Sequence, residues 1–140
     1  MTSYEVKLIF AVGRCPTVAV ESRMAVVNAT EEFERWIEGL SHREQKTVLQ
    51  VVKILEQVGI ALGEPYSSAL KGTKHPLREL RPKRGASPLR IIYAFDPKRE
   101  ALLLIGGDKG NDKRFYDRAI PKAEQLWEAH LKHLEKEGER

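Results

Sequence analysis

The 140-residue sequence is poor in cysteine and in long apolar runs, and Cys15 is its only cysteine. One cysteine cannot form an internal disulfide or a thiolate metal site, and such usage is typical of proteins kept in a reducing cytoplasm. The longest apolar runs have about five residues, whereas a membrane-spanning helix needs about 20. The composition therefore predicts a cytoplasmic protein without membrane association.

The first 23 residues do not connect to the pattern that follows them. The apolar run 8–12 is too short for a signal peptide, whose apolar region has about 7–15 residues, and 13–16 lacks a cleavage pattern. We predict that residues 1–23 form an N-terminal extension and that residues 24–140 form one domain. The alternative is that residues 1–23 supply an additional strand at a sheet edge.

Three common kinds of site are missing from the sequence. The segment Gly106–Lys109 follows an expected strand, but it lacks the rest of a phosphate-binding P-loop. His42 lies in a helix cap, and the spacing of His130 and His133 alone does not make a metal site. No nucleophilic triad is recognisable either. From the missing P-loop and the missing metal-ligand spacing, we expect no cofactor and no metal.

Positive charge is concentrated in the middle of the chain. The whole sequence has a net charge of +4, yet segment 68–118 has thirteen Lys and Arg against six Asp and Glu, a surplus of +7. A basic segment of this kind is expected where a phosphate backbone binds, because Lys and Arg displace its condensed counterions. The alternative is a solvated surface with scattered lysines.

The N-terminal half of the domain predicts a short strand and two helices. The strand covers 24–28, and Thr30 then has the position of a helix N-cap. Ser41 and Glu44 have the spacing of a capping box that begins a second helix, which Gly59 ends. Both helices have apolar residues at helical spacing: Phe33, Trp36, Ile37 and Leu40 in the first, and Val48, Val51, Val52, Leu55 and Val58 in the second. Trp36 is accordingly expected in the core.

The C-terminal half predicts a loop over 63–76 and three strands, 77–81, 89–95 and 101–105, joined by short turns. A polar loop over 106–117 follows, and Pro121 is expected in the first turn of a last helix whose buried face includes Trp127. The predicted fold class is therefore α+β, with a helical hairpin packed on a small antiparallel sheet and a C-terminal helix.

A set of cations and one tyrosine falls on these strands and on the loop after them. Its members are Arg78, Arg81, Arg90, Lys109, Lys113, Arg114 and Tyr116. Side chains alternate between the two faces of a strand, so Arg78 and Arg81 are expected on opposite faces unless a bulge intervenes. Antiparallel neighbours bring the other members together only where the strand registers agree.

The order of several motifs resembles the RelE/ParE toxin superfamily, in particular its HigB-like and phage-derived RelE-like branch. The motifs are Leu70-Lys71-Gly72, Leu77-Arg78-Glu79-Leu80-Arg81, Leu89-Arg90-Ile91-Ile92-Tyr93-Ala94-Phe95, Leu104-Ile105-Gly106-Gly107-Asp108-Lys109, Tyr116 and Ala119-Ile120-Pro121. The resemblance extends from about Met24 to Leu134. It implies a compact ribonuclease-like fold that cuts mRNA in the ribosomal A site without a metal.

The resemblance also implies roles for single residues. Arg90 matches the strand arginine that holds the transition-state phosphate, and Arg81 matches a further cation of the sheet. Lys109 matches a member of the basic pair after the last strand, and Tyr116 matches the aromatic residue nearest the scissile nucleotides. These four are the predicted catalytic residues. The predicted RNA-binding residues are Lys71, Lys74, Arg78, Lys113 and Arg114. Gly110 stands where RelE has an arginine, so Lys109, Lys113 or Arg114 would have to supply that charge.

Each assignment has a structural alternative. Arg90 can pair with Glu79, Tyr116 can be an aromatic residue at the edge of the core, and Lys109 can be an ordinary loop lysine. At the level of function, the alternatives to an mRNA endonuclease are a ParE-like gyrase inhibitor and a non-catalytic phage-derived relative. The expected partners are mRNA on the ribosome and a co-encoded antitoxin, such as a helix-turn-helix protein.

Overall fold

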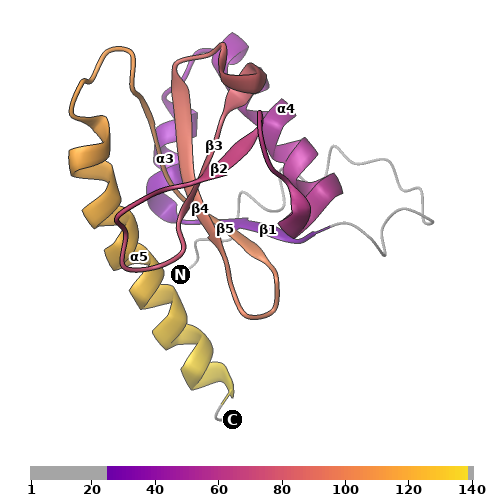
Figure 1. The fold of residues 1–140 in the computed structure, drawn as a ribbon, viewed down its shortest axis with the longest axis vertical. Helices are drawn as coiled ribbons and strands as arrows, with labels where there is room; N and C mark the ends of the chain where they lie inside the picture. The colour runs from indigo at the N-terminus through magenta and orange to yellow at the C-terminus, as the bar shows by residue number, and fades with distance from the viewer. Residues whose placement is uncertain (1–24, 139–140) are drawn as a thin grey trace.

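The structure is a computed structural model that describes residues 25–138, and it has helices on both sides of one sheet (Figure 1). In chain order the elements are β1 (Val27–Ala29), α3 (Glu31–Glu38), α4 (His42–Val58), the short helix η1 (Gly59–Ala61), β2 (Ser67–Ala69), β3 (Arg78–Leu80), the short helix η2 (Pro82–Gly85), β4 (Leu89–Phe95), β5 (Ala101–Asp108) and α5 (Phe115–Gly138). The prediction for residues 1–23 concerns residues outside this range.

The sheet has five strands in the order β1-β5-β4-β3-β2. The pairs β2–β3, β3–β4 and β4–β5 are antiparallel, which confirms the α+β class and the predicted meander. The sheet is mixed rather than wholly antiparallel, because β1 pairs with β5 in parallel. Strand β2 was not predicted, because it lies inside the segment 63–76 that was expected to be a loop.

The two predicted helix starts are confirmed by their caps. The Thr30 side chain accepts a hydrogen bond from the Phe33 N–H, and it also donates to the Leu104 carbonyl, which fixes the start of α3 to β5. Ser41 and Glu44 form the reciprocal capping box at the start of α4. These local bonds satisfy N–H groups that a helix end would otherwise leave free.

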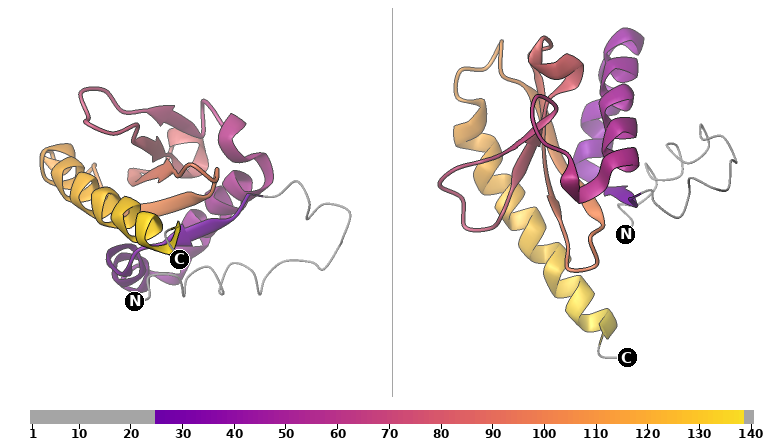
Figure 2. Two further views of the ribbon diagram at one scale, coloured as in Figure 1. Left: turned by 90° about the horizontal axis from the view of Figure 1, so that it is seen from below. Right: turned by 45° about the vertical axis from the view of Figure 1, so that its right-hand side comes forward.

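Each face of the sheet has its own apolar core, and Figure 2 shows the sheet between α4 on one side and α5 on the other. The first core contains Val27, Phe33, Val48, Val51, Leu55, Leu80, Ile91, Tyr93 and Leu103, among others. The second contains Leu77, Ile92, Ala94, Leu102, Leu104, Phe115, Ala119, Ala123 and Trp127. Trp127 is a core residue as expected, whereas Trp36 is only partly buried against the first core.

The end of β5 and the start of α5 differ from the sequence prediction. β5 continues through Gly106 and Gly107 to Asp108, where a loop was expected. A Cβ on either glycine would lie 2.3 Å from an aromatic ring, that of Trp36 at Gly106 and that of Phe115 at Gly107. The glycines therefore allow two rings to pack closely on the strand from opposite sides.

Helix α5 begins at Phe115, so Pro121 lies inside the helix rather than in its first turn. The expectation was wrong because proline also occurs within helices, where it removes one backbone hydrogen bond. None of the helices within residues 25–138 is long and apolar enough to cross a membrane.

Candidate phosphate-binding site

The two charged residues of strand β3, Arg78 and Glu79, lie on opposite faces of the sheet, as expected because side chains alternate along a strand. Arg78 faces the first core, where its Nε donates to Ser67 Oγ at 3.1 Å and its Nη2 to the Leu62 carbonyl at 3.4 Å. Ser67 Oγ lies 2.6 Å from the Tyr93 hydroxyl in the same network. The structure therefore separates Arg78 from the other predicted site residues of the strands and gives it structural partners.

Glu79 and the residues around it form a cluster on the α5 face. The Tyr116 hydroxyl donates to Glu79 Oε1 at 2.5 Å, and Arg81 Nε donates to Glu79 Oε2 at 2.9 Å. Arg90 Nε lies 4.0 Å from the same Oε2. Ser68 Oγ accepts from Arg81 Nη2 at 2.9 Å. Three of the four predicted catalytic residues thus converge on one carboxylate.

The register of the sheet explains why these residues meet. Glu79 lies between Ser68 on β2 and Ile92 on β4, and Arg90 lies two residues before Ile92 on the same face of β4. Arg90 is opposite Gly107, over which the Phe115 ring packs. Because Tyr116 follows Phe115 in the first turn of α5, its hydroxyl reaches Glu79 from above the sheet.

Arg90 is held rigidly and is only 5% exposed. Its Nη1 donates to the carbonyls of Ser87 and Leu89 at 2.6 and 2.7 Å. Its buried Nε has no hydrogen-bond partner in the described part of the chain. The alternative pairing with Glu79 is therefore present only as an ion pair at the limit of contact, and a buried donor remains for an anion.

Tyr116 is protonated at neutral pH and donates a hydrogen bond to Glu79. Burial, together with the hydrogen bond and the negative charge of Glu79, raises its pKa to about 12, while Arg90 acts in the opposite direction. The hydroxyl therefore stays protonated beside the carboxylate. The ring is half-buried and lies edge-on to Phe115 at a centroid distance of 5.0 Å.

The other predicted cations lie outside this cluster. Lys109, Lys113 and Arg114 are exposed on the turn between β5 and α5, with no ion pair to another residue of 25–138. Lys71 and Lys74 lie on the exposed loop before β3, and the Lys74 N–H donates to Glu124. Glu124 is eight residues beyond Tyr116 on α5, which corresponds to about 12 Å along the helix.

The turn at Gly110 explains part of the departure from RelE. The Gly110 N–H donates to Asp108 Oδ1 at 2.8 Å, and a Cβ at this position would lie 3.0 Å from the Pro88 Cβ. An arginine here would therefore require the turn to move by a few tenths of an ångström. The Lys109 N–H donates to the Pro88 carbonyl and places Lys109 at the same end of the sheet as Arg90.

Sequence reasoning missed the central role of Glu79 and the contribution of Ser68. Glu79 was considered only as a partner of Arg90, although it shares a strand face with Arg81 and is an acid within a basic segment. At 5% exposed it is also a buried charge, which needs such partners. Within residues 25–138, no three His, Cys, Asp or Glu side chains are grouped so that they could hold a metal ion.

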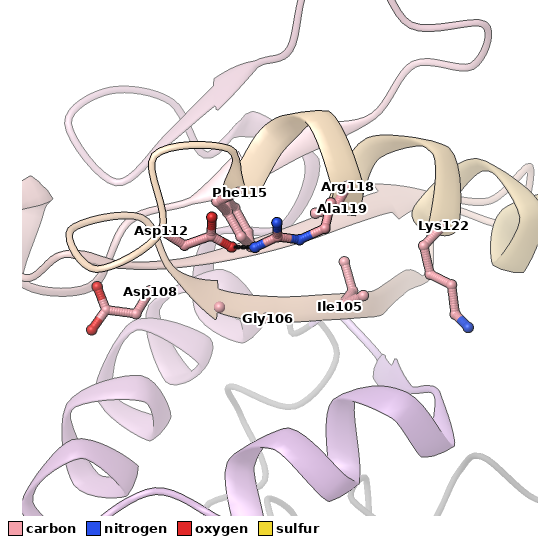
Figure 3. Close-up of a pocket in the computed structure, with 9 residues that line it drawn as sticks. Ile105, Gly106, Asp108, Asp112, Phe115, Arg118, Ala119 and Lys122 are labelled. Carbon is pink, nitrogen blue, oxygen red and sulfur yellow. Dashed lines mark hydrogen bonds and ion pairs between the residues drawn. The ribbon is translucent and has the colours of Figure 1, made fainter.

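A pocket of about 410 Å³ lies on the other side of the first turns of α5 (Figure 3). Its lining comes from the end of β5 and from α5: Ile105, Gly106, Gly107, Asp108, Asp112, Phe115, Arg118, Ala119 and Lys122. Arg118 and Asp112 form an ion pair across its wall, and Tyr116 is not part of the lining. The pocket is therefore separate from the Glu79 cluster.

Comparisons of the sequence with known proteins identify the family of the chain. Residues 35–128 match the family described as "Phage derived protein Gp49-like (DUF891)". The chain is 42% identical to "Putative toxin HigB3" of Mycobacterium tuberculosis over 104 residues, covering 73% of this chain and 89% of the relative. It is 36% identical to "Putative toxin HigB2" of the same organism over 108 residues.

The match to HigB2 covers 75% of this chain but only 54% of the relative, so the chain spans about half the length of that protein. No solved structure matches the chain. The chain belongs to the Gp49-like family, within the HigB-like branch of the RelE superfamily that the sequence motifs indicated.

Proposed function

We propose that the protein is the toxin of a toxin–antitoxin module and acts as a metal-independent endonuclease on mRNA at the ribosome. The observation that carries the proposal is the convergence of Arg81, Arg90 and Tyr116 on the Glu79 carboxylate. The Glu79 side chain accepts from these donors in the structure, and a phosphate diester needs donors of the same kind. The names of the two HigB relatives support the toxin assignment.

RNA supplies its own nucleophile, so the proposed reaction needs no covalent enzyme intermediate. The 2′-oxygen forms a bond to phosphorus, the bond from phosphorus to the 5′-oxygen breaks, and the products are a 2′,3′-cyclic phosphate and a 5′-hydroxyl. Arg90 and Arg81 would bind the non-bridging oxygens, which gain negative charge in the transition state. A pre-organised cation at such a position commonly lowers the barrier by about 3 kcal/mol.

Two members of the cluster fit the two proton transfers. Tyr116, with its pKa raised to about 12, would donate its proton to the departing 5′-oxygen, which leaves as the 5′-hydroxyl. Glu79 would accept the proton of the 2′-hydroxyl once the phosphate has replaced it as the partner of the arginines. Lys109, which is exposed on the turn, would bind the RNA backbone.

The same reasoning gives the expected partners and location. A toxin of this kind requires a co-encoded antitoxin, and we propose one of helix-turn-helix type, with mRNA on the ribosome as the target. The exposed cations of the Lys109–Arg114 turn and of the loop that contains Lys71 and Lys74 are proposed to bind RNA outside the cleavage site. This activity belongs in the cytoplasm.

The first test is induced expression in a bacterial host, with primer extension on a long translated mRNA. We expect growth arrest and discrete cuts within the reading frame, and loss of both in Arg90→Ala. Arg35→Ala, which removes an exposed arginine from α3, is the matched control and should cut normally. Because Arg90 is buried, its replacement could also unfold the protein. A urea unfolding curve of Arg90→Ala and of the more conservative Arg90→Lys shows whether a variant that no longer cuts RNA is still folded.

The outcomes separate the competing functions. Growth arrest without RNA cuts would favour the gyrase inhibitor, and no arrest from a folded protein would favour a non-catalytic relative. Cut RNA that carries a 5′-phosphate rather than a 5′-hydroxyl would contradict the metal-independent mechanism.

A second variant tests the proton acceptor. Glu79→Gln keeps the size of the side chain and one hydrogen-bond acceptor, but its amide cannot take a proton. We expect single-turnover cleavage to slow by about 100-fold, the lower range for removal of a general base, while RNA binding is retained. Cleavage at the normal rate would instead restrict Glu79 to positioning Arg81 and Tyr116.

A further inference from the structure

The outer edge of β5 is covered by another strand only along its first half. β1 pairs with Ala101–Leu103, and Thr30 binds the Leu104 carbonyl. Among residues 25–138, no strand pairs with this edge at 105–108. An uncovered strand edge presents unpaired main-chain N–H and C=O groups, to which another chain can add a strand.

The direction of the free groups follows from the ladder with β4. The Lys109 N–H donates to the Pro88 carbonyl, so residues at alternate positions, Gly107 and Ile105, also direct their main-chain groups toward β4. The main-chain groups of Gly106 and Asp108 point to the opposite edge. The pocket of about 410 Å³ lies along this edge (Figure 3).

The side chains around the edge combine an apolar floor with free positive charge. Ile105, Phe115 and Ala119 form the apolar part. The nearby carboxylates have local donors, since Asp108 accepts from Gly110 and Asn111, and Asp112 binds Arg118. Lys122 is exposed and makes no ion pair with another described residue, like Lys109, Lys113 and Arg114 on the adjoining turn.

We propose that the edge of β5 left uncovered by residues 25–138, together with this pocket, forms a docking site for an extended, acidic segment of a partner protein, which adds a strand beside residues 105–108. Four strand residues span about 13 Å, enough to pair with three or four residues of the partner. Alternate apolar side chains of that segment would enter the pocket beside Ile105 and Ala119. Its carboxylates would face Lys122 and the cationic turn.

The strand edge is what favours a peptide over RNA. Positive charge attracts both polyanions, but only a peptide backbone offers N–H and C=O groups that match those of Gly106 and Asp108. The site is also distinct from the proposed cleavage site. Phe115, Arg118, Ala119 and Lys122 are on the pocket side of α5, whereas Tyr116 binds Glu79. The proposal therefore does not depend on the endonuclease activity.

The test is a titration of the ¹⁵N-labelled full chain, followed by backbone amide shifts. The probe is a capped six-residue peptide of alternating glutamate and valine. It is compared with its lysine–valine counterpart, with the acidic peptide N-methylated at every residue, and with six-residue oligouridylate. We expect the acidic peptide alone to shift the Gly106 and Asp108 amides and to protect them from hydrogen exchange.

Charge reversal at the edge supplies the matched protein variants. Lys122→Glu should weaken binding of the acidic peptide by about fivefold, the effect of about 1 kcal/mol from one rim charge. Lys98→Glu makes the same charge change at the exposed turn between β4 and β5 and should leave the affinity unchanged.

Three results would overturn the proposal. Equal binding of the N-methylated peptide would show attraction by charge without strand pairing. A shift of the Gly106 and Asp108 amides by oligouridylate but not by the peptide would make this edge an RNA surface. The absence of any shift at millimolar acidic peptide would show that the edge does not accept a strand of this composition.

Discussion

The two faces of the sheet are built from the same strands, yet they use their polar residues differently. On the face covered by α3 and α4, Arg78, Ser67 and Tyr93 form a hydrogen-bonded network at the edge of an apolar core. On the face covered by α5, the apolar core gives way to Glu79 with two arginines. On the first face the arginine has neutral partners, whereas on the second the arginines surround a carboxylate.

This difference shows how one strand can serve both the fold and a site. Neighbouring residues of a strand lie on opposite faces of the sheet. Arg78 therefore faces the core under α3 and α4, whereas Glu79 faces α5. Arg78 is expected to affect mainly the free energy of unfolding, and Arg81 mainly the activity. Pairs of similar substitutions on the two faces test that separation.

The largest effect on stability is expected from the two neighbouring glycines of β5. In Gly106→Ala and Gly107→Ala the new Cβ would lie 2.3 Å from the rings of Trp36 and Phe115, respectively. Overpacking of this kind should lower the free energy of unfolding by about 2 kcal/mol at Gly106, where Trp36 is partly exposed, and by about 3 kcal/mol at Gly107.

Only the Gly107 variant should also reduce RNA cleavage, since it displaces Phe115 beside Tyr116. Urea unfolding and cleavage assays measure the two effects. Gly63→Ala is the control, because a Cβ there has no atom within 4 Å. If Gly106→Ala reduced cleavage in proportion to Gly107→Ala, the separation of the two faces would be wrong.

The next comparison uses the two arginines of the β3 segment. Arg78→Ala leaves Ser67 and the Leu62 carbonyl without this donor and should lower the free energy of unfolding by about 2 kcal/mol. Arg81→Ala removes a partly exposed partner of Glu79 and should cost about 1 kcal/mol. Its cleavage rate should fall by about 100-fold, as expected for loss of a preorganised donor. If Arg78→Ala slowed cleavage more and Arg81→Ala destabilised the fold more, the assignment of Arg78 to stability and Arg81 to activity would be wrong.

Much of the fold could be predicted from local sequence signals. The caps at Thr30 and Ser41 and the apolar run of β4 depend on neighbouring residues, so the sequence alone indicates them. Strand β2 and the parallel pairing of β1 depend on partners far along the chain. The extension of β5 was missed because two glycines usually indicate a loop, and only packing with Trp36 and Phe115 explains them here.

The site was predictable to a similar degree. Alternation placed Arg78 and Arg81 on opposite faces, as the structure shows. The convergence on Glu79 depends on the register between β3 and β4 and on the position of α5, neither of which a local pattern contains. The roles predicted for the four catalytic and five RNA-binding residues of the sequence analysis remain predictions.

The smallest expected effects on stability come from removing one hydroxyl on each face. The Tyr93 ring is fully buried and its hydroxyl contacts Ser67, so Tyr93→Phe should lower the free energy of unfolding by about 1 kcal/mol without changing cleavage. Tyr116→Phe should change stability by a similar amount at pH 7 but slow cleavage by about 100-fold, because the proposed proton donor is lost.

Alkaline pH provides a further test of the contact between Tyr116 and Glu79. The unfolded chain releases a tyrosine proton at a pKa of about 10, whereas the folded chain retains the Tyr116 proton to about 12. The stabilisation from Tyr116 is therefore complete below pH 10 and is lost as the pH rises to 12. The half-buried ring is screened by solvent, which reduces the expected loss to about 1 kcal/mol. Urea unfolding at pH 8 and pH 11.5 should show this loss in the wild type but not in Tyr116→Phe, and an equal loss in both would contradict the Tyr116–Glu79 contact.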